Sequence, residues 1–226
     1  SFLWVVVKGS DSRITALSLG QIESKKWTTN SVELKNIKFP ARLIAIEVYE
    51  PSSEDNSKPF ELYLNSIELI NSNNNLIKTI PLDNSLNWTE LPTSEGFDTT
   101  INYNSEGLIL NLGNGSTRGI RGMYLSNYDQ GIPVVVNSEF IEESGIEIGE
   151  RFIFNSSGSY IPMKIEKKIN YFSGTSEKYE SFLITDLRLL KNYMELTKLQ
   201  SFGPNELVVL IDDGFQENSS IYIEEN

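Results

Sequence analysis

Residues 131–154 read GIPVVVNSEFIEESGIEIGERFIF, and the spacing of apolar residues along them changes from that of a strand to that of a helix. The β-branched run at residues 132–136 predicts a buried strand. Asn137 or Ser138 can cap a following helix, because either side-chain oxygen can accept a backbone N–H at a helix start. Gly145 supplies the left-handed residue that ends this helix. The stretch therefore predicts the beginning of a mixed α+β unit.

The pattern continues through further strands and one more helix. Thr185 or Asp186 can cap the second helix, in which Leu187, Leu190 and Met194 recur at spacings of three and four and so form one apolar stripe. We expect strands at residues 152–154, 161–169, 181–184 and 207–211, a polar loop at residues 171–180, and a helix stop at Gly203 and Pro204. Residues 131–226 are therefore predicted to form one α+β unit.

This order of elements resembles a known family. The segment IPVVVNSEFIEESGIEIGERF looks like the strand, short helix, Gly-Glu and strand of the extracytoplasmic core domain in FtsX-like and MacB-like ABC transporter permeases. The later segment INYFSGTSEKYESFLITDLRLLKNYM is similar to the loop, strand and D-L-x-x-L helix of the same family, with Ser173 where many relatives carry proline. The resemblance implies a domain without catalytic residues that lies between membrane helices.

Residues 1–130 show strand patterns with turn residues between them and no helical period. We expect strands at residues 2–7, 14–19, 26–34, 42–49, 60–70, 76–80, 86–91, 107–112 and 122–128, and a hairpin turn at the glycines of residues 113–116. Strands spaced in this way are typical of a β-sandwich. A single sandwich requires the strand around Trp88 to join a sheet that contains residues before Asn71.

The sandwich region also resembles a family. SFLWVVVKG, the Gly20 to Trp27 segment and the strand LYLNSI at residues 62–67 are similar to galactose-binding-like jelly rolls of carbohydrate-binding modules. The resemblance implies sugar stacking on exposed aromatic rings, for which Trp27 and Trp88 are the candidates. Such jelly rolls often hold a structural calcium, with carboxylate and carbonyl oxygens as ligands. Asp11, Glu61 and Asn65 are candidate ligands, although their spacing does not demand a metal, and we expect no other cofactor.

The residues that the chain lacks exclude most catalytic chemistry. It has 226 residues and contains neither histidine nor cysteine, which removes Ser-His-Asp and Cys-His nucleophiles, histidine-ligated zinc and disulfides. No P-loop motif is present, so the chain does not hydrolyse ATP by that mechanism. A glycosidase with paired carboxylates stays open, but the carboxylates are scattered over polar positions. We expect the protein not to be an enzyme.

Charge and hydropathy limit its partners. The net charge of −12 at pH 7 argues against nucleic acid, because phosphates require clustered Lys and Arg. No apolar run approaches the roughly 20 residues that cross a bilayer as a helix. The chain starts inside an expected strand, without an initiator Met, which indicates a fragment of a longer protein with any membrane helices outside it.

These observations lead to one main hypothesis and two alternatives. The main hypothesis is the extracytoplasmic region of an ABC transporter permease at the cell membrane, which passes movement between membrane helices and an external protein or glycan. Its partners would be the rest of the permease and its ATPase subunit. The first alternative is a secreted or surface carbohydrate-binding protein. The second is an interaction scaffold without membrane linkage.

Overall fold

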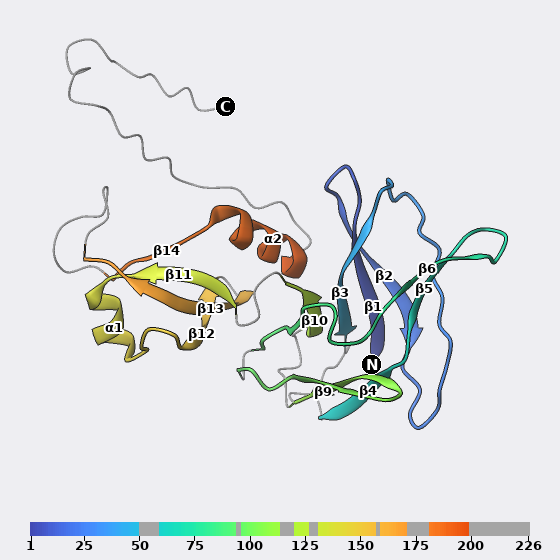
Figure 1. Ribbon diagram of the computed structural model, residues 1–226, viewed down its shortest axis with the longest axis horizontal. Helices are drawn as coiled ribbons and strands as arrows, with labels where there is room; N and C mark the ends of the chain where they lie inside the picture. The colour runs from blue at the N-terminus through green and yellow to red at the C-terminus, as the bar shows by residue number, and fades with distance from the viewer. Residues whose placement is uncertain are drawn as a thin grey trace, which may run out of the picture.

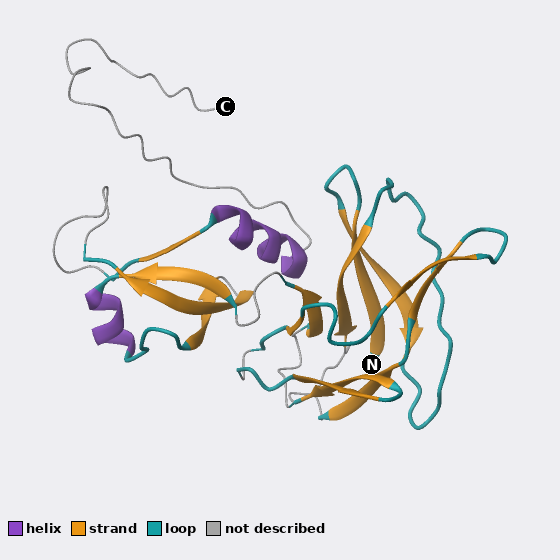
Figure 2. Cartoon of the chain, viewed as in Figure 1, coloured by secondary structure: helices purple, strands orange, loops and turns teal. Residues whose placement is uncertain are grey.

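The chain was analysed as a computed structural model, which describes residues 1–49, 59–93, 96–113, 120–126, 131–156, 159–170 and 181–198. The described part is mainly β, with two short helices (Figures 1 and 2). The strands are β1 (Phe2–Lys8), β2 (Ile14–Gln21), β3 (Arg42–Tyr49), β4 (Phe60–Leu64), β5 (Ile67–Ile70), β6 (Leu76–Ile80), β7 (Trp88–Glu90), β8 (Thr100–Asn104), β9 (Gly107–Leu112), β10 (Arg121–Leu125), β11 (Ile132–Val136), β12 (Arg151–Ser156), β13 (Ser159–Lys168) and β14 (Leu183–Thr185), and the helices are α1 (Ser138–Ser144) and α2 (Leu187–Lys198).

The largest sheet is antiparallel and has the strand order β2-β1-β3-β10-β7. Trp88 begins β7, which pairs with β10 and so lies in one sheet with the three strands nearest the N-terminus. This is the pairing that a single sandwich requires. The central strands β1 and β3 consist largely of apolar residues because both of their faces are covered.

A second, three-stranded sheet with the order β4-β9-β8 shares a hydrophobic core with the largest sheet. Alternate residues of β9, namely Leu108, Leu110 and Leu112, are fully buried, while the residues between them are only partly covered. They pack in one cluster with Leu3 and Ile46 of the five-stranded sheet. The strands β5 and β6 form a separate two-stranded hairpin.

Three predictions for the first 130 residues were wrong in detail. Residues 26–34 contain no strand, because this polar segment has no strand beside it, and Trp27 is 59 % exposed. The predicted strand at residues 60–70 is divided into β4 and β5, which belong to different sheets. The strand β8 was not predicted, because its sequence TINYN is polar and four of its five residues are exposed.

The strands on either side of the predicted hairpin at residues 113–116 do not pair with each other. A hairpin there would pair β9 with the next strand, yet β9 pairs with β4 and β8, whereas β10 pairs with β3 and β7. The chain after Gly113 therefore crosses from one sheet to the other. Residues 114–119, which contain most of the connection, lie outside the described part of the chain.

The segment after residue 130 forms a mixed sheet with the order β12-β13-β11-β14. Here β11 runs parallel to β13 and antiparallel to β14. The helix between β11 and β12 has the predicted caps: Asn137 accepts a hydrogen bond from the Phe140 backbone N–H, and Gly145 has φ 69°. The predicted loop at residues 171–180, the stop at Gly203 and Pro204, and the strand at residues 207–211 lie outside the described residues.

Helix α2 is present, but its predicted apolar stripe is shifted. Leu187 is 46 % exposed, whereas Tyr193, Met194 and Leu196 are buried. Asp186 caps the helix through a 2.7 Å hydrogen bond from the Arg188 backbone N–H to its Oδ1 atom. Leu189 and Leu190 pack partly buried against the apolar cluster, so Leu187 is the one residue of the predicted stripe that lies outside it.

Core residues from both halves of the chain pack in one cluster. It joins Val6, Ala45 and Tyr124 of the five-stranded sheet to Val134 of β11 and Met194 of α2, with Leu190 packed against it. The five-stranded sheet is thus covered by the β4-β9-β8 sheet on one face and by α2 with its neighbours on the other. A domain boundary at residue 130 stays a prediction. Neither described helix has the length and apolar character that crossing a membrane requires.

Candidate functional site

Two regions of the described structure bring chemically distinctive side chains together. The first is the contact between the five-stranded sheet and the α2 and β12 elements, which we call the junction; it contains Lys8, Glu47, Glu90, Tyr124, Arg151, Tyr193 and Glu195. The second is an exposed aromatic surface beside a pocket, formed by Trp27, Tyr63 and residues at the β8–β9 turn.

The apolar part of the junction is a pair of buried tyrosines. Tyr193 of α2 meets Tyr124 of β10 edge to face, with ring centroids 5.4 Å apart and planes at 75°. The Tyr193 hydroxyl donates a 2.8 Å hydrogen bond to the Tyr160 carbonyl oxygen in β13. Burial raises the pKa of Tyr193 well above its ordinary value and that of Tyr124 to about 12, so both hydroxyls stay neutral at physiological pH.

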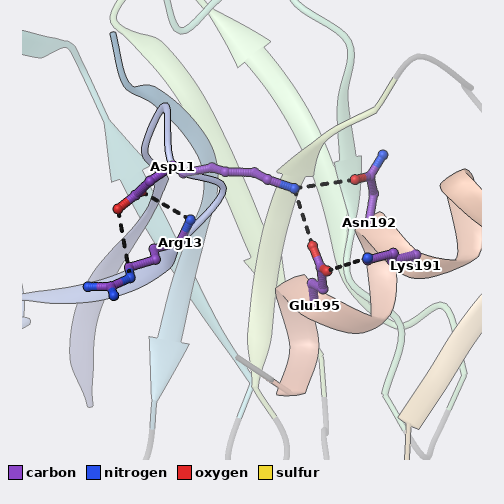
Figure 3. A network of polar contacts seen from close by, with 6 residues as sticks. Asp11, Arg13, Lys191, Asn192 and Glu195 are labelled. Carbon is purple, nitrogen blue, oxygen red and sulfur yellow. Dashed lines mark hydrogen bonds and ion pairs between the residues drawn. The ribbon is translucent and has the colours of Figure 1, made fainter. Parts of the chain in front are cut away.

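One polar contact of the junction joins β1 to α2. The Lys8 Nζ atom lies 3.2 Å from Glu195 Oε2 and 3.4 Å from Asn192 Oδ1. On its other side Glu195 Oε1 lies 3.7 Å from Lys191 Nζ, and Figure 3 shows that Lys191, Asn192 and Glu195 all project from helix α2. The Lys8 and Glu195 side chains are only 14 % and 13 % exposed, so water screens this pair less than a surface pair.

A second polar contact joins β7 to β12. Arg151 donates a 2.6 Å hydrogen bond from Nη2 to Glu90 Oε1, and its guanidinium lies 4.1 Å from the centroid of the Phe97 ring. The ion pair and the cation–π contact hold the same guanidinium from two sides. The four-stranded sheet is thus attached to the edge of the five-stranded sheet as well as to its face.

A buried carboxyl group also lies in the junction. Glu47 of β3 is 5 % exposed, and its Oε1 atom makes no hydrogen bond with the chain. Burial raises the pKa of Glu47 to about 7, because an ionised carboxylate loses its hydration there. Glu47 was not singled out from the sequence, although a glutamate that interrupts the apolar run LIAIEVY is a visible signal.

Of the two predicted stacking residues, Trp27 is on the surface and Trp88 is not. Trp27 contacts the exposed ring of Tyr63 edge to face, with centroids 6.5 Å apart. The Tyr63 hydroxyl donates a 2.7 Å hydrogen bond to Glu61, an interaction that raises the pKa of this tyrosine. Trp88 is 8 % exposed and belongs to the core between the two sheets, so the structure does not bring the two indoles together.

A pocket of about 290 Å³ lies at the end of β4, beside the β8–β9 turn. Its polar lining comes from Asn65, Asp83, Tyr103, Asn104 and Glu106. The Asn65 amide donates a 2.7 Å hydrogen bond to the Glu106 carbonyl oxygen. A hydrogen bond with Ser85 lowers the pKa of Asp83, which is therefore ionised at neutral pH. Glu106 lines the pocket, and its charge also contributes to the raised pKa of Tyr63.

Each of the three candidate calcium ligands forms a hydrogen bond with a different residue, and the structure does not bring the three together. Asp11 accepts a hydrogen bond from the Arg13 backbone N–H in the turn between β1 and β2, Glu61 accepts one from Tyr63, and Asn65 donates to Glu106. Figure 3 shows Asp11 turned toward Arg13. Within the described ranges, no group of three or more acidic side chains is arranged to hold a metal ion.

Comparison of the chain with family models, curated proteins and solved structures gave no match in any of the three.

Proposed function

We propose that the chain is the extracytoplasmic domain of an ABC transporter permease of the FtsX-like or MacB-like type. In this proposal residues 1–130 form a jelly-roll-like sandwich and residues 131–226 form the α+β core unit. The domain is not an enzyme. It lies on the outer side of the cell membrane and passes conformational change between membrane helices and an external partner, while the ATPase subunit supplies the energy.

The observation that carries this proposal is the junction. A domain that transmits movement must resist deformation between its points of attachment, and close-packed interiors resist compression. The junction supplies such packing through Tyr124 and Tyr193. The ion pairs of Lys8 with Glu195 and of Arg151 with Glu90 hold it at two separate places. The sandwich and the α+β unit should therefore move as one body.

A distance measurement in the intact transporter tests this proposal. We expect the parent gene to encode hydrophobic helices next to this chain and to have an ATPase partner. Because the chain contains no cysteine, spin labels can be placed at Ser18→Cys in β2 and Glu166→Cys in β13, both exposed positions. The distance between these labels should stay constant when ATP binds, while the distance from either label to the membrane changes.

Two results would contradict the proposal. One is a parent sequence without hydrophobic helices beside this chain. The other is a distance between the two labels that changes with nucleotide as much as the distance to the membrane does. A matched pair of labels at Ser18→Cys and Glu61→Cys, both on the sandwich sheets, gives the constant distance expected within one body.

The second candidate function is a secreted or surface carbohydrate-binding protein, favoured by the aromatic surface and its pocket. The rings of Trp27, Tyr63 and Tyr103 are exposed, and Tyr103 lines a pocket of about 290 Å³ whose amide and carboxylate groups can exchange hydrogen bonds with hydroxyls. No lysine or arginine lines the pocket. The negative charges of Asp83 and Glu106 disfavour sulfated or uronic glycans, so a neutral oligosaccharide is the ligand that fits best.

Calorimetric titration with neutral cello-, xylo-, manno- and galacto-oligosaccharides tests this second function. We expect saturable binding to at least one of them and, on Trp27→Ala or Tyr103→Ala, binding weaker by roughly fivefold, the equivalent of about 1 kcal/mol for a lost ring contact. Phe154→Ala is the matched control, since Phe154 is an equally exposed aromatic residue on β12. The absence of binding across the set would remove this function.

A further inference from the structure

Glu47 lies where the five-stranded sheet meets helix α2. It is two residues from Ala45 on β3 and therefore on the same face of the sheet, the face that packs against α2. Its neighbours across the ladder are Trp4 on β1 and Gly122 on β10. Gly122 has no side chain, so the ladder partner of Glu47 on β10 contributes no side chain beside the carboxyl group. Ala45, two residues away on this face, packs in the same core cluster as Tyr193 of α2, and the charge of Glu47 contributes to the raised pKa of Tyr193.

One oxygen of this carboxyl group, Oε1, has no hydrogen-bond donor in the described chain. The Oε1 atom of Glu47 and the indole Nε1 of Trp4 are both buried, and neither makes a hydrogen bond within the protein. A buried polar atom without a partner costs free energy, and the cost is much larger once the group is ionised.

The charged and titratable groups on this face are committed to other partners. Lys8 of β1 binds Glu195 and Asn192 of α2, and Arg151 of β12 binds Glu90 of β7. The Tyr193 hydroxyl donates to Tyr160, and the Tyr124 hydroxyl is hydrogen-bonded to Ser126. Neither nearby cation is thus paired with Glu47, and the two tyrosines offer hydroxyls that are already engaged.

We propose that Glu47 is a proton-sensitive latch of the junction: α2 is docked while the Glu47 carboxyl group is neutral and becomes loosened when that group ionises. Hydration stabilises an ionised carboxylate that has no hydrogen-bond donor, and more water reaches Glu47 when α2 moves away from the sheet. Proton uptake then favours docking and proton loss favours release. The inference rests on the mechanical function proposed above, because it names what regulates the stiffness of the same junction.

The direction of the effect follows from the burial of the group. Burial raises the pKa of Glu47 from 4.5 to about 7 while α2 is docked. In the loosened state the group regains water and its pKa returns toward the ordinary value. The docked state therefore loses stability relative to the loosened state as pH rises from about 4.5 to about 7, and above that range the difference is constant.

Hydrogen exchange of the whole 226-residue chain tests the latch. Amide protection of α2, corrected for the intrinsic effect of pH on exchange, is measured at pH 5.5 and 8.5. In the wild type, protection of the buried half of α2 should fall by about tenfold or more at the higher pH, as a carboxyl group shifted by more than one pKa unit predicts. Glu47→Gln, which cannot ionise, should retain its protection. Glu68→Gln, an exposed glutamate on β5, should behave as the wild type.

A second measurement does not depend on how well the variant folds. The side-chain carboxyl carbons of the glutamates are titrated by NMR in the wild-type chain, and the resonance missing from Glu47→Gln identifies Glu47. A midpoint near 7 supports the latch. A midpoint near that of the exposed glutamates overturns it, and so does α2 protection that depends on pH in the same way in the wild type and in Glu47→Gln.

These experiments separate the latch from the proposed function. Both are done on the chain without a transporter, so an unchanged α2 protection removes the latch and leaves the permease proposal to its own test. Conversely, a parent gene without membrane helices removes the permease proposal, while pH-dependent docking of α2 in the isolated chain still establishes the latch.

Discussion

Tyr193 of α2 and Tyr124 of β10 are 69 positions apart in the numbering, yet their rings meet edge to face with centroids 5.4 Å apart. Both side chains are buried, and they connect the helix to the five-stranded sheet.

Removing the Tyr193 ring should weaken the docking of α2 and the stability of the whole chain. Tyr193→Ala leaves a cavity between two core elements, and truncation of a buried aromatic residue costs about 3–5 kcal/mol. Tyr193→Phe keeps the ring and removes only the hydrogen bond to Tyr160, so it should cost about 1 kcal/mol. Urea denaturation monitored by circular dichroism gives both values. Equal costs for the two variants would show that the ring contributes nothing beyond its hydroxyl.

The Lys8–Glu195 pair should contribute more than a surface ion pair. A double-mutant cycle with Lys8→Met and Glu195→Gln should give a coupling free energy of about 1–2 kcal/mol, since both side chains are largely shielded from water. The exposed pair Lys35 and Glu33, whose side chains are 72 % and 74 % exposed, is the matched control and should give about 0–0.5 kcal/mol. The prediction fails if the two cycles give the same value.

Replacing Glu47 should change how stability depends on pH. The folded-state pKa of about 7 exceeds the unfolded value of 4.5, so the wild type loses stability as pH rises between these values. Glu47→Gln removes that loss and should be more stable than the wild type at pH 8, by on the order of 2–3 kcal/mol. Near pH 4 the two proteins should differ little. Thermal unfolding across this pH range measures the difference, and parallel pH profiles would contradict the prediction.

The Asn137 side chain should stabilise two segments, the start of α1 and the chain just before β14. Its Oδ1 atom accepts hydrogen bonds from the Phe140 backbone N–H at 3.2 Å and from the Phe182 backbone N–H at 3.0 Å, so it also holds the chain just before β14. Asn137→Ala should cost about 2–3 kcal/mol, roughly the sum of a lost helix cap and a lost hydrogen bond. Ser138→Ala, at the next position, should cost less than about 0.5 kcal/mol. Chemical denaturation of both variants checks the contrast.

The sequence predicts elements whose signals are local. The caps Asn137 and Gly145 and the strand between residues 132 and 136 were found because capping chemistry and a β-branched run depend on neighbouring residues only. Strand pairing depends on distant residues, so the sequence did not show that β9 and β10 belong to different sheets, and the polar strand β8 was missed.

The same limit applies to the candidate sites. Trp27 and Trp88 have similarly polar neighbours in the sequence, and only the sheet pairing of β7 makes one of them a core residue. The junction residues come from β1, β3, β7, β10, β12 and α2, and no spacing along the chain brings them together. Glu47 could have been predicted as a site residue, because the sequence of β3 shows a charged residue at a position where the strand pattern calls for an apolar one.

Two consecutive residues of β1 belong to different hydrophobic cores, one on each face of the five-stranded sheet. Val5 packs with the leucines of β9, whereas Val6 packs with Tyr193 and Met194 on the opposite side of the same sheet. A perturbation on one side can therefore reach the other only through a backbone that both sides share. With fluorinated valines at these two neighbouring positions, one fluorine NMR spectrum would show whether a ligand bound at the aromatic surface changes the chemical shift of Val6, on the α2 side, as well as that of Val5.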